Sequence, residues 1–134
     1  MLISTRGRYA LRVLIDLAEH SEGNFIPMKE VAARQGISLK YLEQILPILT
    51  KSHVIEAAHG KGGGYRLYKE PDAIKVSDIL KLTEGDLSPV ACLGDEAKEC
   101  DRKGECRTIE LWNGLNQVVN TYLDKYSIAD LAHM

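Results

Sequence analysis

The sequence predicts a mainly α-helical fold with one small β-hairpin, and three observations predict it. Apolar residues recur at spacings of three and four in successive segments, which is the pattern of helices with one buried face. Two of these segments are joined by a turn of about four residues that contains a glycine. A glycine-rich run between two short strand-like segments follows directly, as in a hairpin. Together they indicate a winged helix-turn-helix domain followed by a long C-terminal helix.

The first predicted helix runs from Thr5, which can cap its start, to about His20. The second covers residues 28–35 and ends at Gly36, since glycine readily adopts the conformation that terminates a helix. The positions expected to form the buried face of the first helix are Tyr9, Ala10, Val13, Leu14, Leu17 and Ala18.

The third predicted helix follows Ser38, a suitable N-cap, and extends to about Ser52. We expect it to bend at Pro47, which has no backbone N–H to donate. The turn at residues 35–38 has the length and composition of a helix-turn-helix, although an ordinary helical hairpin would have the same pattern.

The segment after this helix favours DNA binding. Residues 54–58 and 65–68 are predicted strands, and residues 59–64 form the turn between them. The turn carries His59 and Lys61, and its glycines would let the backbone approach a phosphate closely. A nucleotide-binding loop is the alternative. It is disfavoured because no Lys-Ser/Thr pair follows the glycines, and a strand follows in place of a helix.

A fourth helix with apolar Val76, Ile79, Leu80 and Leu82 is expected to end at Gly85. The long helix, from about Thr108 to Tyr126, has two apolar stripes, so it should contact more than one surface. One stripe could dock on its own domain and the other on a second copy; docking of the whole helix into its own core is the simpler alternative. The two stripes consist of Leu111, Leu115, Val118 and Tyr122, and of Trp112, Val119, Leu123 and Tyr126.

We expect a homodimer, because helix-turn-helix proteins usually bind paired half-sites. The predicted division of the chain is a winged helix-turn-helix domain at residues 1–85, a cysteine-containing loop at 86–107, and a dimerisation helix with a C-terminal tail at 108–134.

Composition and charge fit a DNA-binding protein without proving one. Apolar residues make up 45% and charged residues 27% of the 134 positions, as in soluble globular proteins. Residues 1–70 hold ten Lys/Arg against seven Asp/Glu, whereas residues 71–134 hold seven against twelve. No apolar run approaches the roughly 18 residues of a membrane span, and no signal peptide is evident, so we expect a cytoplasmic protein without a membrane partner. No catalytic triad, HExxH motif or nucleotide fingerprint occurs, so we do not expect an enzyme.

Three cysteines, Cys92, Cys100 and Cys106, lie within 15 residues of one another, and the rest of the chain has none. An odd number argues against a closed set of disulfides. Thiolates are ligands for iron–sulfur clusters, zinc or copper(I), and the spacing lacks the close cysteine pair of a zinc finger. A redox-sensing loop without metal is the alternative.

Several of these motifs in combination resemble the Rrf2 family of bacterial transcription regulators. The resemblance covers nearly the whole chain. It is carried by residues 3–11 (ISTRGRYAL), 36–38 (GIS) with 41–46 (YLEQIL), 62–65 (GGGY), and the cysteine block leading into 110–112 (ELW). The pattern is nearest to members that regulate iron–sulfur cluster assembly. It implies a winged helix-turn-helix homodimer joined by the long helices.

The resemblance also implies a cluster held by Cys92, Cys100 and Cys106, for which we expect [2Fe–2S]. Ile109 stands where cluster-assembly regulators have a fourth, histidine ligand, and Arg8 stands where nitric-oxide sensors of the family have an aspartate. Glu110 is the nearest carboxylate. Other possible fourth ligands are Asp95, Glu96, Glu99, Asp101, Glu105, water or a small thiol.

The residues expected to contact operator DNA lie on the third helix, the wing and the start of the first helix. Glutamine suits adenine, glutamate suits the cytosine amino group, and serine suits either kind of base edge. The resemblance implies that Glu43 reads a base; a solvated surface charge is the alternative. The cluster-assembly regulators that the chain resembles have an arginine suited to the minor groove at the position of His59, while the lysines and arginines of this chain suit phosphates. The predicted contacts are Ser38, Lys40, Tyr41, Glu43, Gln44, His59, Lys61, Arg6 and Arg8, with Arg12 as a further candidate.

We therefore expect a DNA-binding regulator, a repressor, whose operator binding responds to an iron–sulfur cluster or to thiol redox state and which controls genes of iron–sulfur cluster biogenesis. The alternative is a regulator of cysteine or sulfur metabolism that is controlled by a protein partner, with cysteines that bind no cluster.

Overall fold

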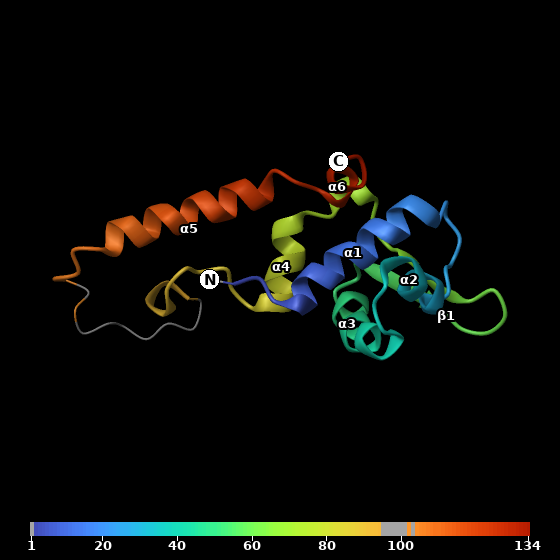
Figure 1. The fold of residues 1–134 in the computed structure, drawn as a ribbon. Coiled ribbons are helices and arrows are strands. Elements are labelled where there is room, and N and C mark those ends of the chain that lie inside the picture. Colours follow the sequence, from blue (N-terminus) through green and yellow to red (C-terminus); the bar gives the residue numbers. More distant parts are fainter. Residues whose placement is uncertain (1, 95–101, 103) are drawn as a thin grey trace.

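The computed structural model describes residues 2–94, 102 and 104–134, and it has the predicted mainly helical class with one hairpin. Figure 1 shows a body at one end and helix α5 extending away from it. The elements, in order, are α1 (Thr5–His20), α2 (Met28–Gln35), α3 (Leu39–Lys51), β1 (Ile55–Ala58), β2 (Gly64–Leu67), a short 3-10 turn η1 (Pro71–Ala73), α4 (Val76–Glu84), a second turn η2 (Ala91–Leu93), α5 (Ile109–Asp124) and α6 (Ile128–Ala132).

The main core lies where α1, α2, α3 and the hairpin meet, and it also receives α6. The apolar positions that the helical spacing predicts for α1 and α3 are largely buried, so the amphipathic pattern identified the inward faces correctly. The largest fully buried apolar side chains are Val13, Leu14, Leu17, Val31, Leu42, Ile45, Leu49, Ile55, Ile79 and Ile128.

The start of α1 differs from the prediction. Ser4, and not Thr5, is the N-cap, and its Oγ accepts a hydrogen bond from the Gly7 N–H at 3.1 Å. Ser4 also donates from its N–H and its hydroxyl to Glu84 Oε1, at 3.0 and 2.6 Å. A Cβ at Gly7 would lie 2.3 Å from that same oxygen, so glycine permits the close approach of α1 and α4.

Helix α3 continues through Pro47 to Lys51, close to the predicted end at about Ser52, and the bend at Pro47 stays a prediction. The two strands pair antiparallel, with Ile55 opposite Leu67 and Ala58 opposite Gly64. Ile26 adds an isolated bridge to Tyr65 beside β2, which ties the α1–α2 loop to the hairpin.

The C-terminal region holds an element that the sequence analysis missed. Helix α5 ends at Asp124, two residues before the predicted Tyr126, and a capping box at Ser127 and Asp130 starts α6. Ile128 then packs into the main core. The first α5 stripe, Leu111, Leu115, Val118 and Tyr122, is exposed, whereas of the second stripe only Leu123 and Tyr126 pack on the described body. None of the described helices is long and apolar enough to cross a membrane.

Asp16 is a charged residue on the buried face of α1 and is completely inaccessible to solvent. Arg34 of α2 donates to both of its carboxylate oxygens, and Gln35 donates to Oδ2 at 2.9 Å. Burial alone would raise the pKa of Asp16, but these hydrogen bonds and the Arg34 charge outweigh burial and lower that pKa. The ionised carboxylate is therefore favoured in the folded chain.

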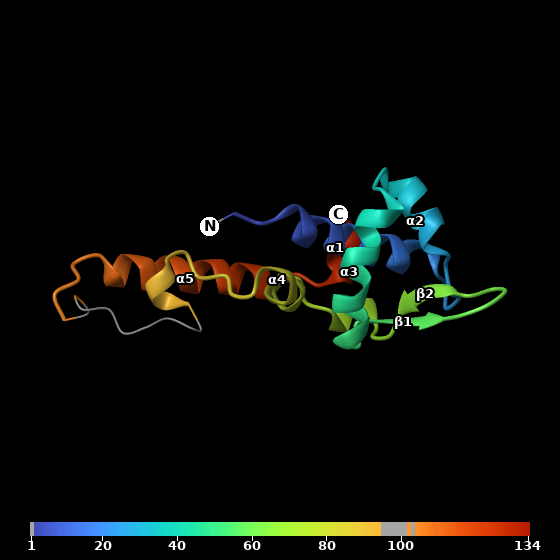
Figure 2. The same ribbon diagram turned by 90° about the horizontal axis from the view of Figure 1, so that it is seen from below.

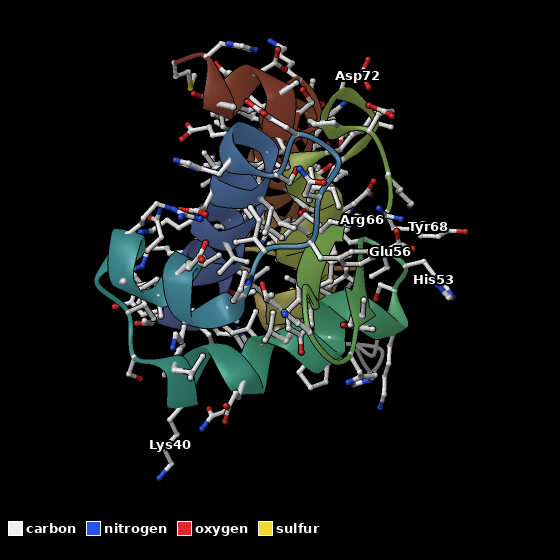
Figure 3. All side chains as sticks on the ribbon, turned by 90° about the vertical axis from the view of Figure 1, so that its right-hand side faces the viewer. Lys40, His53, Glu56, Arg66, Tyr68 and Asp72 are labelled. Carbon is white, nitrogen blue, oxygen red and sulfur yellow. The ribbon has the colours of Figure 1, made fainter. Side chains whose placement is uncertain are left out.

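Replacing this carboxylate should cost stability in a pH-dependent way. Because the folded-state pKa is lowered, the carboxylate stabilises the fold fully above about pH 5, and this contribution is lost as the pH falls below about 4. We expect Asp16→Asn to lower the free energy of unfolding by about 2 kcal/mol at pH 7 and by less at pH 3. Urea denaturation at both pH values tests this, with Asp72→Asn, whose carboxylate points into solvent (Figure 3), as the control. A pH-independent difference would contradict the assignment.

Candidate nucleic-acid interface

The first two turns of α3 present polar side chains to solvent. Ser38 caps the helix by accepting from the Tyr41 N–H at 3.1 Å, and Lys40, Glu43 and Gln44 are exposed. Lys40 extends from the start of α3 away from the body (Figure 3). The turn before the helix is possible because Gly36 adopts the left-handed conformation, with φ 64° and ψ 34°.

Tyr41 differs from its neighbours on α3. Its ring is only partly exposed and packs edge to face against Tyr9 of α1, with ring centroids 5.3 Å apart. Tyr41 is therefore an anchor of α3 as well as a predicted DNA contact.

The hairpin forms a projecting wing beside α3, as Figure 2 shows. His59 and Lys61 are exposed in its tip, and Gly60 and Gly62 adopt positive φ values of 87° and 79°. Where the strands meet the turn of the wing, a Cβ on Gly64, which pairs with Ala58, would lie 2.2 Å from the Ile26 carbonyl oxygen. Position 64 thus requires glycine for two reasons: the neighbouring backbone is too close for a Cβ, and the residue has a positive φ angle.

Helix α3 and the hairpin line one shallow groove that is mostly apolar, so the helix and the wing form a continuous surface. Lys51 and Tyr65 also line this groove, and they could not be placed there from the sequence, because only the packing of α3 against the hairpin brings them together. Its lining residues are Glu43, Leu46, Pro47, Thr50, Lys51, Ala57 and Tyr65.

Glu56 and Arg66 form an ion pair on one face of the hairpin. These two residues lie opposite each other across β1 and β2, and Arg66 Nε donates to Glu56 Oε1 at 2.5 Å (Figure 3). Arg66 also stacks over the Phe25 ring at 4.1 Å and donates to the Gly23 carbonyl. These contacts fix the base of the wing against the α1–α2 loop.

The arginines of α1 fall into two groups. Arg6 and Arg8 are exposed at the beginning of the helix, whereas the wing lies beyond its other end (Figures 1 and 2). Arg12 is engaged within the protein: it donates from Nε to Gln35 Oε1 at 3.2 Å and from Nη2 to the Gln35 carbonyl. Arg12 thus has partners within the protein, and its contact to DNA stays a prediction.

The described cysteines lie near the two ends of the loop between α4 and α5. Cys92 is exposed in η2, Cys106 is partly exposed just before α5, and both are free thiols. A hydrogen bond with the Thr108 hydroxyl, with Sγ and Oγ1 3.5 Å apart, is the main cause of a lowered pKa at Cys106. Cys100, Asp95, Glu96, Glu99 and Asp101 lie outside the described residues.

The possible fourth ligands that are described lie on the α5 side of this loop. Ile109 is the first residue of α5 and has no ligating atom, while Glu105 and Glu110 are exposed. Within the described part of the chain, no group of three or more His, Cys, Asp or Glu residues could hold a metal ion. The thiol donors are of the kind that suits an iron–sulfur cluster.

Comparison with known proteins gives matches over nearly the whole chain. Residues 3–134 match the family described as "Rrf2: Iron-dependent Transcriptional regulator". The chain is 33% identical over 133 residues to the HTH-type transcriptional regulator IscR of Yersinia pseudotuberculosis, which covers 99% of this chain and 80% of that protein. Among solved structures, CymR, the global cysteine regulator of B. subtilis, is 34% identical with a TM-score of 0.80, covering 99% and 97% of the two chains. IscR of T. potens is 30% identical with a TM-score of 0.76, covering 98% and 85%.

Proposed function

Because the chain belongs to the Rrf2 family of transcriptional regulators, we propose that it binds duplex operator DNA as a homodimer, with α3 in the major groove and the wing beside it. The family consists of regulators and not enzymes, in agreement with the expectation from the sequence. The observation that carries the proposal is the solvent-facing first two turns of α3, with Lys40, Glu43 and Gln44 beside a glycine-tipped hairpin.

In this proposal the contacts divide by chemistry. Glu43 and Gln44 read base edges, together with Ser38 and the Tyr41 hydroxyl, while Lys40, Lys61, Arg6 and Arg8 bind phosphates and His59 faces the minor groove. Rounds of selection from a random duplex library test it. Wild-type protein should enrich one partly palindromic sequence, and Gln44→Ala should relax the preference at one base pair of each half-site. Enrichment of no sequence would overturn the proposal.

The exposed face of α5 supports the homodimer. Four large apolar side chains point outward along one side of this helix, and Val118 and Leu111 are 65% and 61% exposed. Ile3 joins Val118, Val119, Tyr122 and Leu123 in an apolar groove at the same place. Such a face is stable in water when a second copy covers it.

We also propose that Cys92, Cys100 and Cys106 hold an iron–sulfur cluster, which we expect to be [2Fe–2S], and that its state controls operator binding. The soft donor set, the similarity to IscR and the family description as iron-dependent support this assignment. When bound, the cluster would supply one-electron redox chemistry and sensitivity to loss of iron. The cysteines flank the loop that leads into α5, so ligation would alter the base of the proposed dimer helix. Ile109 offers no fourth ligand, and Glu110 in the first turn of α5 is our candidate.

Anaerobic reconstitution tests this part of the proposal. Iron and sulfide should bind in equal amounts, and Cys106→Ser should abolish binding, whereas Ser88→Ala, in the same loop, should not. Operator affinity should differ between the cluster-bound and cluster-free forms. Identical affinity in the two forms would reject control by the cluster.

A second function is favoured by one observation, the similarity at 34% identity to a global cysteine regulator. In this case the chain would regulate cysteine or sulfur metabolism through a protein partner, and the cysteines would bind no cluster. A Cys92→Ala, Cys100→Ala, Cys106→Ala triple variant would then retain normal regulation. Under the cluster proposal it would lose regulation.

A further inference from the structure

A chain of contacts runs from the buried carboxylate of Asp16 on α1 to the start of α3. An ionised carboxylate without solvent needs strong partners, and Asp16 receives three side-chain donors. Arg34 binds it in a bidentate manner, with Nη2–Oδ1 at 2.6 Å and Nε–Oδ2 at 3.0 Å. The third donor is the Gln35 side-chain amide, from the last residue of α2.

Both polar atoms of the Gln35 side-chain amide make hydrogen bonds to α1. Its Nε2 donates to Asp16, its Oε1 accepts from Arg12, and its backbone carbonyl also accepts from Arg12. The last carbonyls of a helix have no partner within the helix, so Arg12 satisfies one of them. Two residues of α1 thus fix the residue directly before Gly36, where the helix-turn-helix turn begins.

The contacts continue to α3 through two aromatic rings. The Arg12 guanidinium lies over the Tyr9 ring, 5.3 Å from its centroid, and the Tyr9 ring meets Tyr41 edge to face. Tyr41 lies in the first turn of α3 and donates its N–H to the Ser38 cap. The connection therefore reaches the turn of α3 that carries Lys40, Glu43 and Gln44.

We propose that Asp16, Gln35, Arg12 and Tyr9 are positioning residues that set the orientation of α3 for reading bases, an inference that rests on the proposed function. Hydrogen bonds to bases need precise placement, whereas contacts to phosphates tolerate small displacements. Loosening this network should therefore weaken binding to the preferred sequence much more than binding to unrelated DNA.

The test compares affinities for two probes: the duplex that wild-type protein enriches from a random library, and a scrambled duplex of the same composition. Gln35→Met keeps the side-chain length and the Asp16–Arg34 pair but removes both amide contacts. Arg12→Lys keeps the positive charge but loses the paired contacts to Gln35. We expect each variant to bind the selected duplex about fivefold to tenfold more weakly, with affinity for the scrambled duplex unchanged within about twofold.

Ile128→Val is the control for general loss of stability, because Ile128 is fully buried in α6 and lies outside the network. It should leave the ratio of the two affinities as in wild type. Equal loss on both duplexes in Gln35→Met would indicate a merely structural role and overturn the inference, as would wild-type selectivity in both network variants. Failure of wild-type protein to enrich any duplex would instead reject the proposed function itself, and this inference with it.

Discussion

Val118→Asp is expected to convert the proposed dimer into a monomer. Val118 lies in the middle of the exposed apolar stripe of α5 and is 65% exposed in the single chain. In a symmetric helix pair, the substitution would place two carboxylates in one apolar contact without a cationic partner. We expect self-association to weaken at least about 100-fold, because uncompensated charges are costly to bury.

Sedimentation equilibrium at micromolar concentration measures this effect directly. Asn113→Asp is the matched control, since Asn113 is exposed on α5 but lies outside the apolar stripe. It should remain dimeric. Operator affinity should fall together with dimerisation in Val118→Asp, because each half-site alone binds weakly. A wild-type monomer, or a Val118→Asp dimer of wild-type stability, would contradict this account of α5.

Gly64→Ala is expected to be the most damaging single-methyl change in the wing. The added Cβ would lie 2.2 Å from the Ile26 carbonyl oxygen, and the backbone on both sides would have to move. The bridge between Ile26 and Tyr65, with N–H···O distances of 2.8 Å in both directions, would be lost first. We expect a loss of about 3 kcal/mol in the free energy of unfolding, the upper range for an overpacked site.

Gly62→Ala supplies the comparison within the same hairpin. Its φ is 79°, but nothing lies within 4 Å of the added Cβ, so only backbone strain of about 1 kcal/mol is expected. Urea denaturation of the two variants separates the effects. Equal stability of the two variants would show that Gly64 is not held by contact with Ile26.

The sequence predicted the helices well because their packing faces follow from spacing alone. Val13, Leu14 and Leu17 recur on one side of α1, and the structure buries all three. Spacing could not predict contacts between distant residues. Ser4 and Glu84 are 80 positions apart, and their hydrogen bonds tie the start of α1 to the end of α4. Similarly, α6 was missed because its five residues are too few for a periodic pattern.

The sequence predicted which residues of the candidate interface face solvent, but not the internal contacts of the residues that support them. Glu43 and Gln44 face solvent, as expected for polar positions of an amphipathic helix. Arg12 was expected to contact DNA, because a basic residue near a helix start suggests a phosphate contact. That contact stays a prediction. The hydrogen bond from Arg12 to Gln35 could not be predicted, because only the packing of α2 on α1 brings the two residues together. The buried Asp16 could not be recognised either, since its neutralising partner is 18 positions away.

The salt dependence of DNA affinity tests the central claim most directly. If α3 and the wing bind the phosphate backbone, the logarithm of wild-type affinity for the selected duplex should fall linearly with the logarithm of salt concentration. Lys61→Ala should reduce that slope by about one, while Lys125→Ala, exposed at the end of α5, should leave it unchanged. Affinity that does not respond to salt, or a Lys61→Ala slope equal to that of wild type, would contradict binding through this surface.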